Sequence, residues 1–139
     1  MWGKLTLPSD QKKDVEKTVR QRFFRPEIYT WKIARGDDVV GYAALDNVLG
    51  KSLPITFLVV FDTEGVIQST HIVKYRESHG GQVKLERWRK QFVGKTHESG
   101  YAVGRDIDGI SGATISVNSV SRGIRKLTFM FETVKGSFN

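Results

Sequence analysis

The sequence predicts an α+β domain, in which an antiparallel sheet of about four or more strands has helices packed on it. Short apolar or alternating runs follow one another between residues 29 and 77, with turn signals between them. Helical periodicity appears before this region and again after residue 114. Because the connections between the expected strands are too short for parallel crossovers, neighbouring strands should run antiparallel.

Composition sets the outer limits on function. The chain has 139 residues, 39% of them hydrophobic and 27% charged, which suits one globular domain with one core. Its formal net charge of +7 favours acidic partners such as phosphates, nucleic acid, anionic lipid or an acidic protein. The absence of cysteine excludes disulfides, thiolate nucleophiles, iron–sulfur clusters and cysteine-ligated zinc. No apolar run approaches the roughly 18 residues that span a bilayer.

The first expected element is a helix near the N-terminus. Ser9 follows Pro8 and can cap the helix, and Asp10 falls in the first turn, where a negative charge is favourable. Pro26 should end the segment. The buried face would carry residues at positions i, i+4 and i+8, namely Val15, Val19 and Phe23.

The strands follow directly. Alternation in the first run puts three apolar side chains, Tyr29, Trp31 and Ile33, on one face. The third run, ITFLVVF, is apolar on both faces and should lie inside the sheet. Turn signals occupy 35–38 and 62–65, and 46–54 reads as a loop. The expected strands are 29–35, 39–45, 55–61 and 66–77.

Two more helices are expected after the strands. A glycine-rich break at 78–81 precedes a helix with Leu85, Trp88 and Phe92 on one face, and Gly94 is a suitable residue just past its end. Residues 95–106 read as irregular. The last helix has apolar residues at i, i+4, i+7 and i+11, namely Val120, Ile124, Leu127 and Phe131.

The segment DGISGAT, at 108–114, leads into this last helix. Small side chains at 111–113 allow a ligand to approach the backbone closely. The first amides of a helix have no partner within it, and the helix dipole there favours an anion. Ser111, Thr114 and Ser116 add hydroxyl groups. The segment therefore predicts a phosphate site, although the same composition also serves an ordinary helix cap.

DGISGAT also fits the pattern D-x-x-[ST]-G-A-[TS], and it resembles the flavinylation motif of FMN-binding domains. Such domains occur in the Rnf and Nqr redox complexes and in small exported bacterial flavoproteins. The resemblance implies that Thr114 carries FMN through a phosphoester bond, made by a magnesium-dependent flavin transferase with FAD as donor. It also implies that Asp108, six residues before Thr114, is required by the transferase.

A second part of the chain is similar to the same family. The segment YRESHGG at 75–81 is followed by ERWRKQFVGK at 86–95, in the family's order and spacing, with His79 where proline is common and with adjacent glycines. The resemblance covers roughly residues 40 to 130. It implies one FMN-binding domain over 1–139, with an N-terminal helical segment at 1–26 and a flavin-binding core at 27–139.

The resemblance implies a set of cofactor-binding residues drawn from both segments. They are Glu77, Ser78, His79, Gly80, Gly81, Trp88, Lys95, Asp108, Ser111, Gly112, Ala113, Thr114, Ile115 and Ser116. The candidates for the wall of the flavin ring are Tyr75, His79, Trp88 and Phe92. Lys95 or Arg105 would lie near the phosphate or stabilise the anionic reduced flavin. We expect Glu77 to accept backbone N–H groups from the SHGG segment. The three histidines lack metal-ligand spacing, so no metal site is expected.

We expect an electron-transfer domain on the extracytoplasmic side of a bacterial membrane, with any export signal lying outside this sequence. Its partners would be the flavin transferase and redox proteins, including acidic ones or a membrane complex, and not nucleic acid, for which no motif is present. Two alternatives stay open. One is a small flavin-dependent reductase, with His79 or Tyr75 as proton donor. The other is a module that binds FMN or another phosphate ligand noncovalently.

Overall fold

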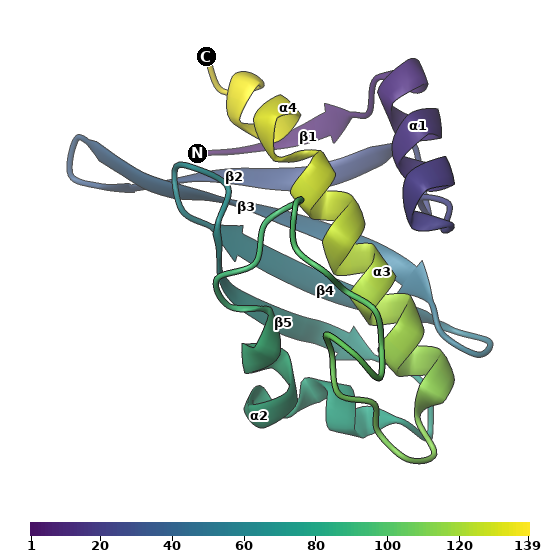
Figure 1. Cartoon of the computed structure of the whole chain (residues 1–139). Coiled ribbons are helices and arrows are strands. Elements are labelled where there is room, and N and C mark those ends of the chain that lie inside the picture. Colours follow the sequence, from purple (N-terminus) through teal and green to yellow (C-terminus); the bar gives the residue numbers. More distant parts are fainter.

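A computed structural model describes all residues, 1–139, and contains one antiparallel sheet of five strands in the order β1-β2-β3-β4-β5. Consecutive strands are neighbours throughout, so every connection is local (Figure 1). The predicted α+β class is confirmed, and the 55–61 strand lies inside the sheet between β3 and β5. The strands are β1 (Trp2–Thr6), β2 (Glu27–Arg35), β3 (Asp38–Leu49), β4 (Pro54–Phe61) and β5 (Ile67–Tyr75).

The helices lie on one face and at the edges of this sheet. The longest, α3, crosses one face diagonally, α1 lies beside its C-terminal half, and α2 lies near β5 (Figure 1). None of the helices combines the length and the apolar character that crossing a bilayer requires. The helical elements are α1 (Ser9–Val19), η1 (Gly81–Lys84), α2 (Glu86–Arg89), η2 (Lys90–Phe92), α3 (Thr114–Phe129) and α4 (Phe131–Gly136).

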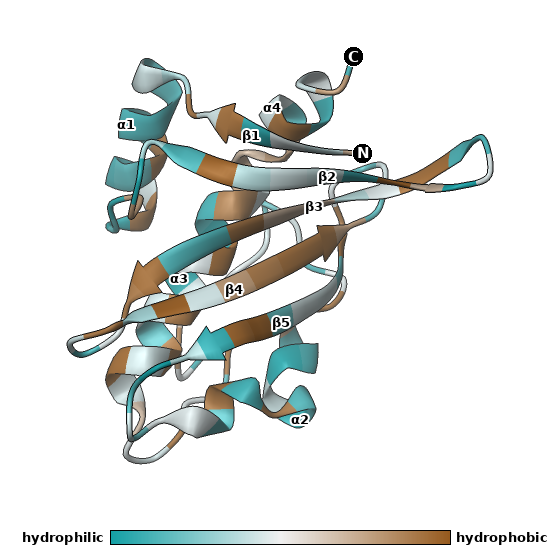
Figure 2. Ribbon diagram, turned by 180° about the vertical axis from the view of Figure 1, so that it is seen from behind, coloured by the Kyte–Doolittle hydropathy of each residue, from teal (hydrophilic) through white to brown (hydrophobic).

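The core fills the space between α3 and the sheet. Alternate residues of β4, Phe57, Val59 and Phe61, are at most 1% exposed and face the helix side. Gly123 lets α3 come close, because a Cβ there would lie 2.6 Å from Val48 Cγ1 and 2.8 Å from Phe57 Cζ. The opposite face of the sheet has no helix over it (Figure 2). The position of α3 is therefore set by close packing on β3 and β4.

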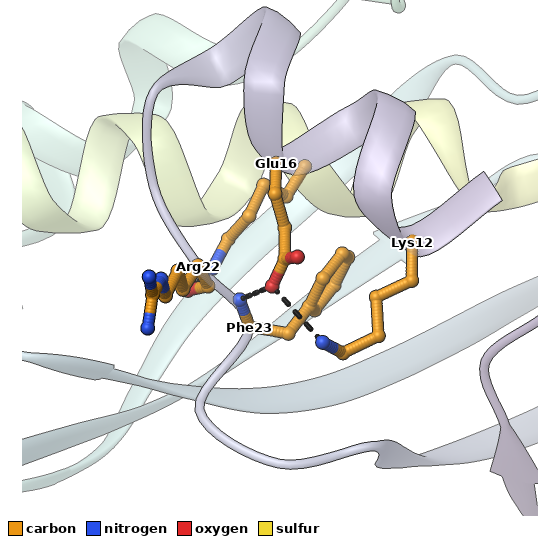
Figure 3. A network of polar contacts seen from close by, with 5 residues as sticks. Lys12, Glu16, Arg22 and Phe23 are labelled. Carbon is orange, nitrogen blue, oxygen red and sulfur yellow. Dashed lines mark hydrogen bonds and ion pairs between the residues drawn. The ribbon is translucent and has the colours of Figure 1, made fainter. Parts of the chain in front are cut away.

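A polar network holds the segment after α1 against the rest of the molecule. The Glu16 carboxylate accepts a 2.7 Å hydrogen bond from the Phe23 amide and a 3.2 Å bond from Lys12 (Figure 3). Lys126 of α3 is fully buried, and its ammonium donates a 2.7 Å bond to the Arg22 carbonyl. Residues 20–23 thus join α1 to α3.

Several predicted boundaries were wrong. The first helix ends at Val19 instead of continuing toward Pro26, because Arg20 takes a left-handed conformation (φ 62°) and its amide bonds back to the Glu16 carbonyl. Residues 46–49 are strand and not loop, since β3 pairs with β4 as far as Leu49 and Pro54. The fourth strand covers 67–75 instead of 66–77.

The helical regions also differ from expectation in detail. The second helix is split into the short turns η1, α2 and η2, and Gly94 does take the expected positive φ, 87°. The last helix breaks at Met130, so that Phe131 begins α4. Strand β1 was not predicted at all. Its pairing with β2, in which Trp2 lies opposite Trp31, brings the N-terminus onto the sheet edge.

Candidate functional site

A cavity of about 500 Å³ lies where the loop after β5 meets the beginning of α3. This volume falls within the roughly 300–1,000 Å³ usual for small-molecule sites. The β3–β4 turn forms its third side. The lining residues are Lys51, Ser52, Glu77, Ser78, His79, Gly80, Gly112, Ala113, Thr114, Ile115 and Ser116. Two segments that the sequence separates by more than thirty residues therefore share one cavity.

The start of α3 provides the anion-binding part of this cavity. Ala113 precedes the helix with φ −128° and ψ 28°, and no side chain caps the helix. The amides of Thr114, Ile115 and Ser116 have no hydrogen-bond acceptor within the protein. Unpaired amides at the positive end of a helix dipole attract an anion. The predicted phosphate site therefore has free donors in the structure.

Thr114 is the first residue of α3 and is exposed to the cavity. Its hydroxyl has no hydrogen-bond partner, whereas its carbonyl accepts a 2.9 Å bond from the Asn118 side chain. Gly112, two residues earlier, has φ 79°, and a Cβ there would meet nothing within 4 Å. The left-handed backbone explains the glycine, and the open space around it leaves the approach to Thr114 free.

The glycine loop after β5 forms the facing wall. The Tyr75 hydroxyl donates to the His79 carbonyl and lies 2.8 Å from the Ser116 hydroxyl of α3. Gly80 has φ 83°, and a Cβ there would lie 2.5 Å from the Tyr75 oxygen and 2.9 Å from the Ser116 oxygen. Only glycine fits this junction, and it holds the loop directly against the first turn of α3.

Glu77 fixes the third side of the cavity. One of its carboxylate oxygens accepts the amides of Ser52 at 2.6 Å and Leu53 at 2.8 Å. These backbone hydrogen bonds, to Ser52 first and then to Leu53, lower the pKa of Glu77. The expectation that Glu77 accepts amides from SHGG was wrong, because the β3–β4 turn lies closer to it. Its bonds favour a structural role.

The structure collects most, but not all, of the predicted site residues around this cavity. Gly81 lies in an adjacent shallow depression with Ser78, His79 and Gly80. Ser111 is exposed but does not line the cavity. The predicted residues that do line it are Glu77, Ser78, His79, Gly80, Gly112, Ala113, Thr114, Ile115 and Ser116.

Asp108 and Trp88 belong to a neighbouring depression of about 320 Å³. The Trp88 ring is 5% exposed, and its Nε1 donates a 2.9 Å bond to the Asp108 carbonyl. The Gln91 side chain accepts the Asp108 amide at 2.8 Å. Trp88 therefore holds the first residue of the DGISGAT segment through its backbone carbonyl. The Asp108 carboxylate is exposed and has no hydrogen-bond partner. Phe92 is fully buried and does not reach the cavity.

Two predicted phosphate cations lie elsewhere. Lys95 donates a 2.8 Å bond to the Gly100 carbonyl and lies over the Tyr101 ring. Arg105 is exposed beside Asp106. The cation at the cavity is Lys51, which sequence reasoning missed together with Ser52. No motif marks these two residues, because only the pairing of β3 with β4 brings their turn to the site.

These features fit a phosphate ester that also carries a planar ring. The free amides and Lys51 suit an anion, the Thr114 hydroxyl is unpaired, and half-exposed Ile115 offers apolar surface at the rim. No group of three or more His, Asp or Glu side chains comes together in a way that could hold a metal ion. The arrangement is suited to holding a phosphorylated cofactor at the entrance of a helix.

Two comparisons with known proteins bear on the family of this chain. The model of the FMN-binding domain family matches residues 50–128, more than half of the chain. A protein of Erwinia tasmaniensis, named as part of an ion-translocating oxidoreductase complex, is 29% identical over 120 residues, covering 77% of this chain and 57% of that protein. The chain thus spans little more than half the length of this relative. The matched region begins at the β3–β4 turn and ends in α3, so it contains every segment of the cavity, and the chain belongs to the FMN-binding domain family.

Proposed function

We propose that FMN is attached to Thr114 through a phosphoester and that the chain serves as an electron-transfer module. The observation that carries this proposal is the exposed, unpartnered Thr114 hydroxyl at the first turn of a helix whose leading amides are also free. A phosphodiester at this position would keep one negative charge beside those amides, where it is stabilised.

The attachment would be made by a flavin transferase with FAD as donor. The Thr114 oxygen forms a bond to the phosphorus on the riboflavin side, the pyrophosphate P–O bond breaks, AMP leaves, and the hydroxyl proton is released. No oxidation or reduction takes place in this step. Thr114 is then a point of attachment and takes no part in later electron transfer.

Bound FMN would supply the redox chemistry, and the chain would position it. The first amides of α3 and Lys51 hold the phosphate end. His79 and Ser78 lie exposed on the facing loop, where their polar groups can contact the ring. Covalent attachment makes occupancy independent of the free FMN concentration, which otherwise determines how much of a cofactor stays bound.

Flavinylation of the 139-residue chain tests the proposal. The chain is co-expressed with a flavin transferase, denatured, and measured by intact mass and in-gel fluorescence. We expect a mass increase of one FMN less one water, and fluorescence that survives denaturation. Thr114→Val should abolish both signals, and Thr114→Ser should keep them, because serine retains the hydroxyl.

A matched control shows whether loss of labelling is specific to Thr114 or follows from replacing any exposed threonine. Thr18 is an exposed threonine on α1 whose hydroxyl donates to the Asp14 carbonyl. Thr18→Val should be labelled like the parent chain. If Thr114→Val were labelled to the same extent as Thr18→Val, Thr114 would not be the attachment residue. If flavin bound but was lost on denaturation, the noncovalent module would be the correct function.

A flavin-dependent reductase is the second candidate function, and one observation favours it. His79 is exposed at the cavity, where its imidazole could donate a proton to a substrate. A reductase would reoxidise its own reduced flavin on adding a small substrate, whereas an electron-transfer module would need a partner protein. Stopped-flow reoxidation of the reduced flavinylated chain, with and without small acceptors, distinguishes the two.

We further propose that its partners are redox proteins of a membrane complex. The relative from Erwinia tasmaniensis carries the name of a component of an ion-translocating oxidoreductase complex, which supports this proposal. The charge of +7 would steer acidic partners, so the rate of electron exchange should fall as salt rises. The extracytoplasmic setting stays a prediction, which a topology reporter fused to the intact gene product would check.

A further inference from the structure

A third cavity, separate from the FMN site, lies between α3 and the loop at 99–105. Its volume is about 270 Å³. About two turns of α3 line it with Asn118, Ser121, Arg122 and Arg125, spaced so that they share one face of the helix. The loop adds Arg105. No residue of this cavity lines the one at Thr114.

The cavity brings three arginines together with one carboxylate, Asp106, beside them. Its walls contain three arginines and no acidic residue. Asp106 lies 3.5 Å from the Arg105 Nε, but the same carboxylate oxygen also accepts the Ala102 amide at 3.0 Å. Arg122 and Arg125 take part in no ion pair. The charges of Arg122 and Arg125 therefore have no carboxylate partner, and an anion between them would relieve their mutual repulsion.

Two buried polar groups here have no partner in the protein. Ser121 is 1% exposed, and its hydroxyl makes no hydrogen bond. The Arg125 Nε is also buried and unpaired. Buried polar groups in native proteins almost always have a partner. Both residues line the cavity, so an acceptor inside it would lie beside these two unpaired groups.

We propose that this cavity binds a small oxyanion of the phosphate or carboxylate type. The arginine guanidinium matches both groups, because its N–H donors can pair with two oxygens at once. Asn118 and Ser121 supply further donors. The volume lies below the roughly 300–1,000 Å³ of sites for larger ligands, so the cavity suits a small anion or the terminal group of a larger one.

Titration of the whole 139-residue chain with inorganic phosphate, followed by amide NMR at low ionic strength, tests the proposal. A parallel titration with succinate decides between phosphate and carboxylate. Both are run on the apo and on the flavinylated chain, since phosphate could also bind the free amides at Thr114 of the apo form. We expect shifts at 99–105 and 118–125 in both forms.

Substitutions separate this site from general attraction to a basic protein. Arg122→Gln and Arg125→Gln should each weaken binding of the preferred anion by about tenfold or more, the usual effect of losing a charged hydrogen bond. Arg35→Gln is the matched control, because Arg35 is exposed at the end of β2, away from the cavity. It removes the same charge and should leave the affinity within about twofold of the parent.

Ser121→Ala provides a variant that keeps every charge. It should weaken binding while leaving the thermal midpoint without the anion unchanged or higher, because an unpaired buried hydroxyl is removed. The proposal is overturned if neither anion shifts 99–105 and 118–125. It is also overturned if Arg35→Gln weakens binding as much as Arg122→Gln does. Either result would mean that water alone satisfies Ser121 and Arg125.

Discussion

The hydroxyl of Tyr75, the last residue of β5, lies 2.8 Å from the hydroxyl of Ser116 in the first turn of α3. Tyr75 also donates to the His79 carbonyl, so one side chain joins the sheet, the glycine loop and the helix that begins at Thr114. The two walls of the cavity at Thr114 are thereby held at a fixed separation. Changes at this junction should therefore affect both the stability of the fold and the shape of this cavity.

Removing the Tyr75 hydroxyl should loosen this junction. We expect Tyr75→Phe to lower the free energy of unfolding by about 1 kcal/mol, the usual contribution of one hydrogen bond. Urea unfolding measures this change. Tyr29→Phe is the control, because Tyr29 is exposed on the open face of the sheet and its hydroxyl makes no hydrogen bond. Equal losses in both variants would contradict a specific role for Tyr75.

Adding a methyl group at Gly80 should be more damaging. Gly80→Ala places a Cβ 2.5 Å from the Tyr75 oxygen at a residue with φ 83°, so both a clash and backbone strain oppose folding. We expect a loss of about 2 kcal/mol or more. Gly136→Ala, in α4, meets nothing within 4 Å and should be neutral or stabilising. Thermal unfolding should show a lower midpoint for Gly80→Ala and an equal or higher midpoint for Gly136→Ala.

Glu77 should control the β3–β4 turn. Glu77→Ala removes the acceptor of the Ser52 and Leu53 amides, so these two amides should exchange with solvent faster, which hydrogen exchange by NMR detects. Because the folded pKa of Glu77 is lowered, its contribution to stability is present at neutral pH and is lost as the pH falls through that lowered pKa. Glu98→Ala, at an exposed residue, should leave both amides protected.

Two buried charged groups, Asp46 and Lys126, should make stability depend on pH. Burial raises the pKa of Asp46 to about 6, against the opposing charge of Lys126 and the Asn47 amide. The folded protein therefore keeps a proton that the unfolded chain loses near pH 4, and the free energy of unfolding should fall by roughly 3 kcal/mol between about pH 4 and 6.

Lys126 acts in the opposite sense at higher pH. Burial lowers its pKa to about 8, although Asp46 and then Glu16 oppose the shift. Stability should therefore recover as the pH rises above about 8, leaving a minimum between about 6 and 8. Urea unfolding at several pH values measures both the fall between about pH 4 and 6 and the recovery above about pH 8. Asp46→Asn should reduce the fall in the free energy of unfolding between about pH 4 and 6. Asp37→Asn, in the exposed turn, should not. An unchanged slope in Asp46→Asn would remove Asp46 as the cause.

Substitutions at Asp108 and Asp106 should affect two different properties, flavinylation by the transferase and the stability of the fold. The Asp108 carboxylate is exposed and has no hydrogen-bond partner, so Asp108→Asn should reduce labelling by the transferase and leave the thermal midpoint unchanged. The Asp106 carboxylate accepts the Ala102 amide at 3.0 Å, so Asp106→Asn should lower the thermal midpoint. Intact mass and thermal unfolding are measured on both variants. Normal labelling of Asp108→Asn would contradict its expected role.

Local sequence was enough to predict the fold class and the start of α3. Alternation predicted the strand that is β2, and a short run that is apolar on both faces predicted β4. Periodic apolar residues predicted α3, because the face on which a side chain lies depends on its position within a few residues. DGISGAT indicated the start of a helix with free amides, because the first amides of any helix lack partners within it and the small residues before this one leave them accessible. The family was also predicted from this motif and is shown by the comparison.

Other features were decided only when the chain folded. The reach of β3 to Leu49 depends on its pairing with β4, and β1 exists because β2 offers it an edge. The partners of Glu77, the position of Trp88 beneath Asp108 and the presence of Lys51 at the cavity all depend on contacts between distant segments. Local periodicity does not encode hydrogen bonds and burial between such segments. The sequence by itself therefore determined where α3 begins and which chemical groups its first turn carries. Tertiary packing decided which residues of other segments lie opposite that turn.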